Sequence, residues 1–92
     1  MANIEIKKLE DFPQSKFEVT VHGERVTQHE VTVTREYYET LTAGAVSAEE
    51  LVKTSFAFLL AREPNTSILA AFDLTVISSY FPEYEREIKR KF

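Results

Sequence analysis

The sequence contains no cysteine and only two glycines among its 92 residues. Without cysteine there can be no disulfide, no thiolate zinc ribbon and no thiol nucleophile, and the chain suits a reducing compartment. Two isolated glycines cannot build a glycine-rich phosphate-binding loop. With three prolines and two glycines, little of the chain is linker. We therefore expect one globular domain over residues 1–92.

An excess of basic residues and a long apolar run are also absent. The formal net charge is −4, whereas a general nucleic-acid binder carries a basic face, because neutralising phosphates supplies most of its affinity. No apolar run approaches the roughly 20 residues that a transmembrane helix needs. The first residues lack the apolar segment of a signal peptide. We expect a cytoplasmic protein that has no membrane segment, and we do not favour nucleic acid as its partner.

Two segments alternate between apolar and polar residues, which is typical of strands with one buried face. Residues 16–22 read KFEVTVH and residues 28–34 read QHEVTVT. A loop of about three residues around Glu24 and Arg25 keeps both apolar sets on one face, with Val19 near Val31 or His29. Residues 4–7 give a weaker strand pattern. We predict an antiparallel hairpin or three-stranded sheet with one face covered by helices.

The middle of the chain carries two sets of helix-boundary residues. Thr34 is a suitable N-cap for a short helix over residues 35–42, and Gly44 follows where a helix end favours positive φ. A strand that continues through Tyr37 is the alternative. Ser47 and Glu50 form a capping box, which begins a long helix over about residues 47–62. That helix ends before Pro64, which disfavours helical geometry in the preceding residue.

The C-terminal part predicts two or three shorter helices. Residues 67–72 favour one or two turns, Asp73 caps a further turn that reaches Tyr80, and Pro82 is suited to the start of a last helix. The predicted fold class is α+β, with all helices packed on one face of the sheet. The expected core is Phe17, Val19, Val21, Val31, Val33, Leu51, Val52, Phe56, Leu59, Ile68, Leu69, Phe72, Ile77 and Phe81.

No residue pattern in the chain is typical of a catalytic, cofactor or metal site. The two histidines, His22 and His29, fall on opposite faces of the predicted sheet, so they cannot share a metal ion, which needs three or four converging ligands. No serine lies in a nucleophile motif, and the carboxylates lie at helix starts or on polar helix faces. We expect no enzyme activity, no cofactor and no metal. A small-molecule or enzymatic site near His29 is one alternative.

The segment over residues 67–81 is a second alternative, because two short helices there would resemble a helix-turn-helix unit. A nucleic-acid-binding regulator needs Arg, Lys, Asn or Gln on its reading helix. Between Asp73 and Tyr80 the chain has none of these. Two packed core helices are the better interpretation of this segment.

The tyrosines give the main functional indication. Tyrosine is amphipathic and common at protein interfaces. We expect an interaction patch that consists of Tyr37, Tyr38, Tyr80 and Tyr84. The favoured hypothesis is a non-enzymatic protein–protein interaction or accessory domain, with a homodimer as one form of it.

Overall fold

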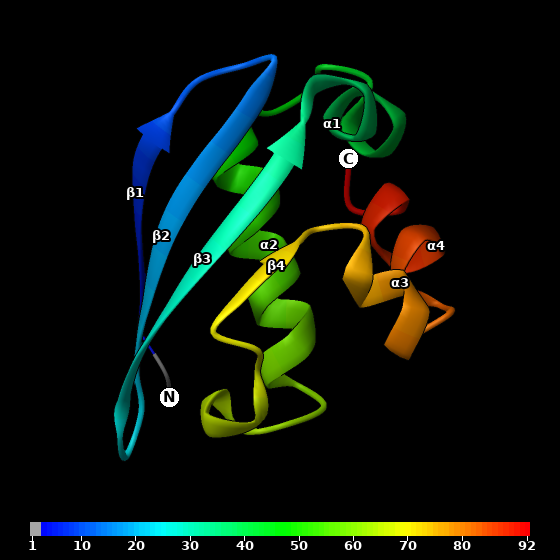
Figure 1. Cartoon of the computed structure of the whole chain (residues 1–92). Helices are drawn as coiled ribbons and strands as arrows, with labels where there is room; N and C mark the ends of the chain where they lie inside the picture. Colours follow the sequence, from blue (N-terminus) through cyan, green and yellow to red (C-terminus); the bar gives the residue numbers. More distant parts are fainter. Residues whose placement is uncertain (1–2) are drawn as a thin grey trace.

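The computed structural model describes residues 3–92 and has the α+β fold that the sequence predicts (Figure 1). Three strands come first, two helices follow, and a fourth strand precedes two short helices. The elements are β1 (Asn3–Glu10), β2 (Gln14–His22), β3 (Val26–Thr34), α1 (Arg35–Thr42), α2 (Ala48–Leu60), the 3-10 turn η1 (Asn65–Ser67), β4 (Ala71–Asp73), α3 (Val76–Tyr80) and α4 (Tyr84–Lys89).

The four strands form one sheet in the order β1-β2-β3-β4. The first three strands are antiparallel, and Val19 lies opposite His29 across a three-residue connection, as the alternation predicts. The strand β4 pairs in parallel with β3 after a crossover through α1 and α2. The helix α2 lies behind the sheet in Figure 1, so one sheet face is covered and the other is open. Along each strand successive side chains point to alternate faces, and two residues paired across neighbouring strands point to the same face.

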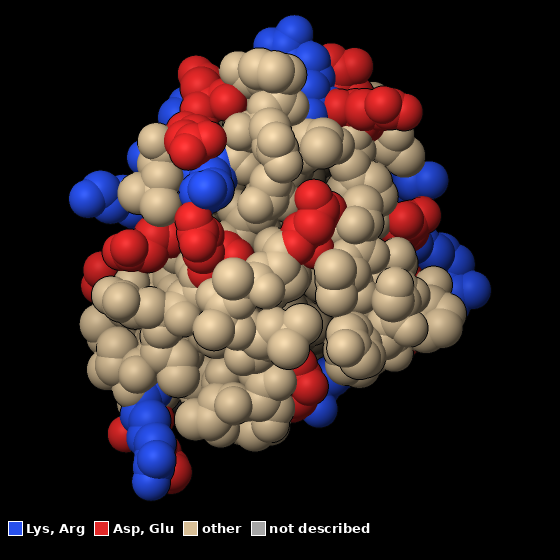
Figure 2. All heavy atoms as spheres, viewed as in Figure 1, with Lys and Arg blue, Asp and Glu red and all other residues tan. Residues whose placement is uncertain are grey.

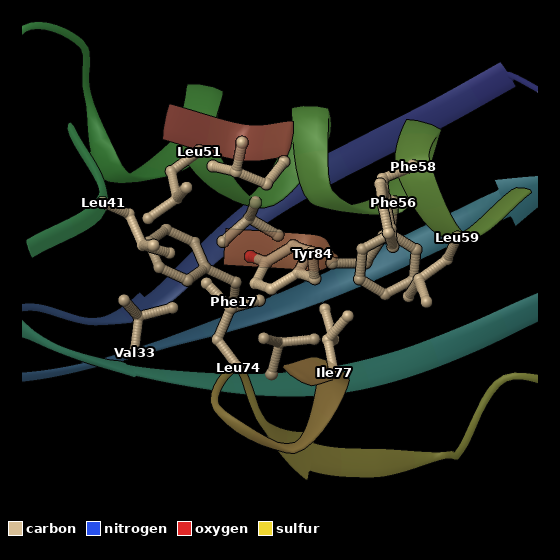
Figure 3. Packing of buried hydrophobic residues seen from close by; sticks show 14 of the residues in the cluster. Phe17, Val33, Leu41, Leu51, Phe56, Phe58, Leu59, Leu74, Ile77 and Tyr84 are labelled. Carbon is tan, nitrogen blue, oxygen red and sulfur yellow. The ribbon is translucent and has the colours of Figure 1, made fainter. Parts of the chain in front are cut away.

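The core lies between the sheet and the helices, where apolar side chains from both layers point toward one another (Figure 3). Eleven of the fourteen predicted core residues are buried, while Phe72 and Phe81 are half-buried and Leu69 is exposed. Several further residues are buried although they are outside the expected core, namely Leu41, Ala48, Phe58, Leu74, Tyr84 and Ile88. The last four come from short C-terminal elements or from the flank of α2, where helical periodicity is weak.

The helical turns predicted over residues 67–72 are wrong. This segment leaves the 3-10 turn and becomes extended, and β4 follows. The Glu30 N–H donates to the Ala70 carbonyl over 2.8 Å, and the Leu74 N–H donates to the Thr32 carbonyl over 2.9 Å. The open edge of β3 therefore supplies backbone partners that a local helix would otherwise provide. Because residues 71–73 are a strand, the predicted helix pair over 67–81 is reduced to α3 alone.

The helix boundaries agree better with the sequence. The Thr34 hydroxyl accepts a hydrogen bond from the Tyr37 N–H, and the Ser47 hydroxyl accepts one from the Glu50 N–H. The predicted cap at Asp73 is wrong in position: its carboxylate accepts bonds from the Thr75 N–H and hydroxyl in the turn before α3, and the N-cap of α3 is Thr75. The helix α2 spans Ala48–Leu60 and α4 spans Tyr84–Lys89, so both are shorter than predicted.

The end of α1 yields a stability prediction, because Ala43 and Gly44 both have positive φ, at 52° and 77°. Positive φ is strained for a residue with a Cβ and free of strain for glycine. We expect Ala43→Gly to raise the free energy of unfolding by about 0.5–1 kcal/mol and Gly44→Ala to lower it by about 1 kcal/mol. Urea denaturation of the two variants measures both effects, and a shift of the same sign in both would contradict this account.

Candidate protein-interaction groove

The four tyrosines of the predicted patch occupy three different environments. Tyr84 is fully buried in the core, whereas Tyr80 is 67% exposed. Tyr37 and Tyr38 are half-buried at the edge of the core. The Tyr37 hydroxyl donates to the Glu85 carboxylate over 2.9 Å, and the Tyr38 hydroxyl donates to the backbone carbonyl of Val46. Only Tyr80 therefore offers most of its ring to solvent.

Tyr84 is held by a chain of hydrogen bonds inside the core. The Ser55 hydroxyl donates to the Leu51 carbonyl over 2.8 Å, so the Tyr84 hydroxyl donates to Ser55 Oγ over 2.6 Å. Burial raises the pKa of Tyr84 well above its ordinary value. Burial and the hydrogen bond to Glu85 also raise the pKa of Tyr37. Both hydroxyls therefore remain neutral donors, and their interactions are those of structural residues.

The two histidines lie on opposite faces of the sheet, as predicted. His22 Nε2 lies 3.0 Å from the Glu5 carboxylate on the open face. His29 is buried, and its Nδ1 lies 2.7 Å from the Leu69 carbonyl. A carbonyl can only accept, so Nδ1 carries the proton and Nε2 accepts from the Thr27 hydroxyl over 2.8 Å. Both ring nitrogens of His29 are therefore engaged within the protein.

Asn65 belongs to the same hydrogen-bond network as His29 and Thr27. Asn65 Nδ2 donates to the Thr27 hydroxyl oxygen over 2.9 Å and to the Arg25 carbonyl over 2.8 Å. Asn65 and the Leu69 carbonyl thus tie the two ends of the segment over residues 65–69 to β3. Gly23 allows the close approach, because a Cβ there would lie 3.3 Å from Asn65 Oδ1. The segment before β4 is consequently fixed by polar contacts although its backbone is irregular.

This fixed segment forms one wall of an apolar groove of about 300 Å³, and α3 forms the opposite wall. Side chains from α2 and β4 complete it. The lining residues that matter most below are Glu63, Leu69, Phe72, Val76, Ile77 and Tyr80. Leu69 is 48% exposed and Tyr80 is 67% exposed. Two of the four exposed large hydrophobic residues of the described chain therefore lie at this one groove.

Figure 2 shows the same region as a broad, largely uncharged surface over β4, α3 and the segment before β4, with acidic and basic residues at its border. Glu63 is the one charged residue that lines the groove. Its side chain is half-buried, and within residues 3–92 no basic group lies within ion-pair distance of it. An apolar groove with one unneutralised carboxylate favours a ligand that is apolar and carries positive charge.

The groove adjoins an edge of the sheet, because β4 is the last strand in the strand order. Ala70 and Leu74 direct a backbone group toward β3, so the alternation along the strand turns the backbone groups of Ala71 and Asp73 outward. An edge strand presents such groups to any further strand. The candidate site therefore combines outward backbone donors and acceptors with an apolar hollow.

Among residues 3–92 no three His, Cys, Asp or Glu side chains are grouped as a metal site would require. Within the same residues, no helix is both long and apolar enough to span a bilayer. Comparisons of the chain with protein-family models, with curated proteins and with solved structures find no match. The geometry of this chain is therefore the basis of the function proposed below.

Proposed function

We propose that this protein is a cytoplasmic, non-enzymatic interaction domain that binds an extended apolar segment of a partner protein in the groove beside β4. The observation that carries the proposal is that two exposed apolar side chains, Leu69 and Tyr80, lie at a groove beside an open sheet edge. Adding a strand to such an edge is a recurrent mode of peptide recognition, in which backbone bonds give affinity and pockets for alternate side chains give specificity.

The electrostatics of the groove define the partner further. Glu63 would gain a counter-ion from a Lys or Arg in the bound segment. Asp73, at the end of β4, adds a second carboxylate near the edge. The formal net charge of −4 favours encounter with a basic partner. Because successive side chains of a strand face opposite sides, the partner is a strand-forming segment whose apolar side chains face the groove and whose basic residues lie on the side of Asp73. A basic residue where the segment leaves the groove would pair with Glu63.

A labelled short peptide that alternates Lys with Val, Phe and Val provides a defined probe. We expect it to bind with a dissociation constant on the order of tens of micromolar, in the range of small, transient interfaces. Leu69→Asp should weaken binding by about tenfold or more, because an apolar anchor is lost. The added negative charge alone would strengthen attraction to the peptide, so a loss reports the groove. Fluorescence anisotropy measures the affinities.

Two controls separate the groove from general charge attraction. Val26→Asp makes the same change at a residue that is 61% exposed on β3, away from the groove, and should leave the affinity unchanged. A peptide with proline at the central positions cannot donate strand hydrogen bonds and should bind weakly. Equal binding to the wild type and to both aspartate variants, or no binding below about 1 mM, would overturn the proposal.

The two alternatives from the sequence receive no specific support. Nucleic-acid binding relied on a helix pair over residues 67–81, of which α3 alone is helical. A site at His29 would need a free ring nitrogen, and both nitrogens are hydrogen-bonded within the protein. We therefore advance neither as a function.

A further inference from the structure

The opposite edge of the sheet, formed by β1, offers a second interaction surface that is independent of the groove. The strand β1 is eight residues long, whereas β4 has three. It pairs with β2 on one side only, and in Figure 1 no other described element lies beyond it. A long edge strand can pair with another strand unless its side chains prevent it.

Side chains on β1 divide cleanly between the two faces of the sheet. Ile4 and Ile6 pair with the buried Val21 and Val19, so both point to the helix-covered face. Both isoleucines are only half-buried. Glu5 and Lys7 pair with Thr20 and Glu18 and point to the open face. On the helix-covered face, the edge therefore carries two isoleucines whose exposed surface a partner could still bury. On the open face, it carries one negative and one positive side chain.

The order of these charges selects one register for a second copy of the chain. An antiparallel pair centred on Ile6 places Glu5 opposite Lys7 of the second copy, and the two-fold axis repeats this pair. Ile6 then lies opposite Ile6 of the second copy on the helix-covered face. Ile4 lies opposite Lys8 of the second copy and packs against its aliphatic stem.

Neighbouring registers are disfavoured. A shift of two residues in one direction places Glu5 opposite Glu5 of the second copy, and a shift in the other direction places Lys7 opposite Lys7. Like charges directly opposite one another destabilise a strand pair. A shift of one residue places Ile6 opposite a charged residue and the helices of the two copies on opposite faces. A bulge between Lys8 and Glu10 ends regular pairing beyond that point.

We infer that the protein forms a two-fold symmetric homodimer by antiparallel pairing of β1 with β1 of a second copy, in the register centred on Ile6. The joined sheet has eight strands and leaves both β4 edges, with their grooves, at its ends. The lysines and the bulge protect β1 from unspecific strand addition, while the alternation of charge permits this one pairing.

A charge-exchange experiment tests the register. In analytical ultracentrifugation over a range of concentrations, the wild type should dimerise, and Glu5→Lys should weaken dimerisation by about tenfold or more, because two symmetry-related pairs change from attraction to repulsion together. The double variant Glu5→Lys, Lys7→Glu should recover dimerisation. Glu39→Lys, an equal change of charge on α1, should have no effect. A wild type that stays monomeric at all concentrations, or a double variant that is no better than the single one, would overturn the inference.

A cross-link gives a second readout that does not depend on charge. Because the chain has no cysteine, Ile6→Cys introduces a single thiol, and the two-fold axis would bring it next to its copy. Mild oxidation should give a covalent dimer for Ile6→Cys and none for Val26→Cys, which is more exposed but distant from the edge. The reverse result would contradict the inferred register. The outcome leaves the groove unaffected, since peptide binding at β4 is measured separately.

Discussion

Replacing Tyr84 with Ala is expected to lower the free energy of unfolding by about 3–5 kcal/mol, the range typical of removing a buried aromatic ring. Tyr84 is fully buried, and its ring meets Phe58 edge to face at 5.3 Å between centroids. Together with Ile88 it packs α4 into the core, and Figure 3 shows its ring among the buried side chains. Since the free energy of unfolding of a domain is about 5–15 kcal/mol in total, this one change would remove a large fraction of it.

The matched variant Tyr84→Phe isolates the hydroxyl. It keeps the ring and removes the bond to Ser55, whose own hydroxyl still donates to Leu51. We expect a loss of about 1 kcal/mol, the usual net value of one hydrogen bond. Urea denaturation monitored by circular dichroism gives both values. If Tyr84→Ala cost no more than Tyr84→Phe, α4 would not depend on this ring for its attachment.

Replacing His29 with Ala is expected to cost about 2–4 kcal/mol. The change removes part-buried hydrogen bonds to the Leu69 carbonyl and the Thr27 hydroxyl, and it removes the buried ring that packs on Phe56 at 5.5 Å between centroids. It also releases one of the two anchors of the wall formed by residues 65–69. Peptide binding in the groove should therefore weaken together with stability.

His22→Ala is the control, because it removes the other histidine from the same sheet. His22 contacts Glu5 on the open face, where a single ion pair contributes little. We expect a change within about 0.5 kcal/mol and no effect on peptide binding. Equal losses for the two variants would show that the buried network of His29 does not hold the segment before β4.

The sheet could be predicted because its signal is local and repeated. Phe17, Val19 and Val21 in β2 and Val31 and Val33 in β3 alternate with polar residues, and the three-residue connection keeps both sets on the same face. The caps at Thr34 and Ser47 are also local, since each hydroxyl bonds an N–H three residues ahead. Features that a few neighbouring residues determine can therefore be predicted from the sequence.

The strand β4 and the groove depend on contacts between distant segments. The apolar spacing of residues 67–72 predicts helical turns, but the free edge of β3 pairs with residues 71–73 and makes them a strand. Leu69 was expected in the core because it is apolar, but its exposure follows from the turn that Asn65 anchors. The one available signal was Asn65 directly after Pro64, a pair of residue types common in turns, and the structure forms a single 3-10 turn there, η1, before the chain becomes extended.

The tyrosine patch shows the same limit. Sequence composition indicates that tyrosines are numerous but does not indicate which rings are covered. The structure buries Tyr84 through α4, engages Tyr37 and Tyr38 at the core edge, and leaves Tyr80 beside the groove. Of the four predicted residues, Tyr80 is thus the one that the proposed function uses.

The central claim is that a partner segment adds to the β4 edge above the groove, and amide chemical-shift mapping tests it most directly. On titration with the alternating Lys and Val–Phe–Val peptide, we expect the largest NMR shifts at Ala71, Asp73 and Tyr80, because the first two direct backbone groups outward and the third lines the groove. Amides around Val26 should not shift. Shifts confined to other surfaces, or none at the β4 edge, would contradict the account.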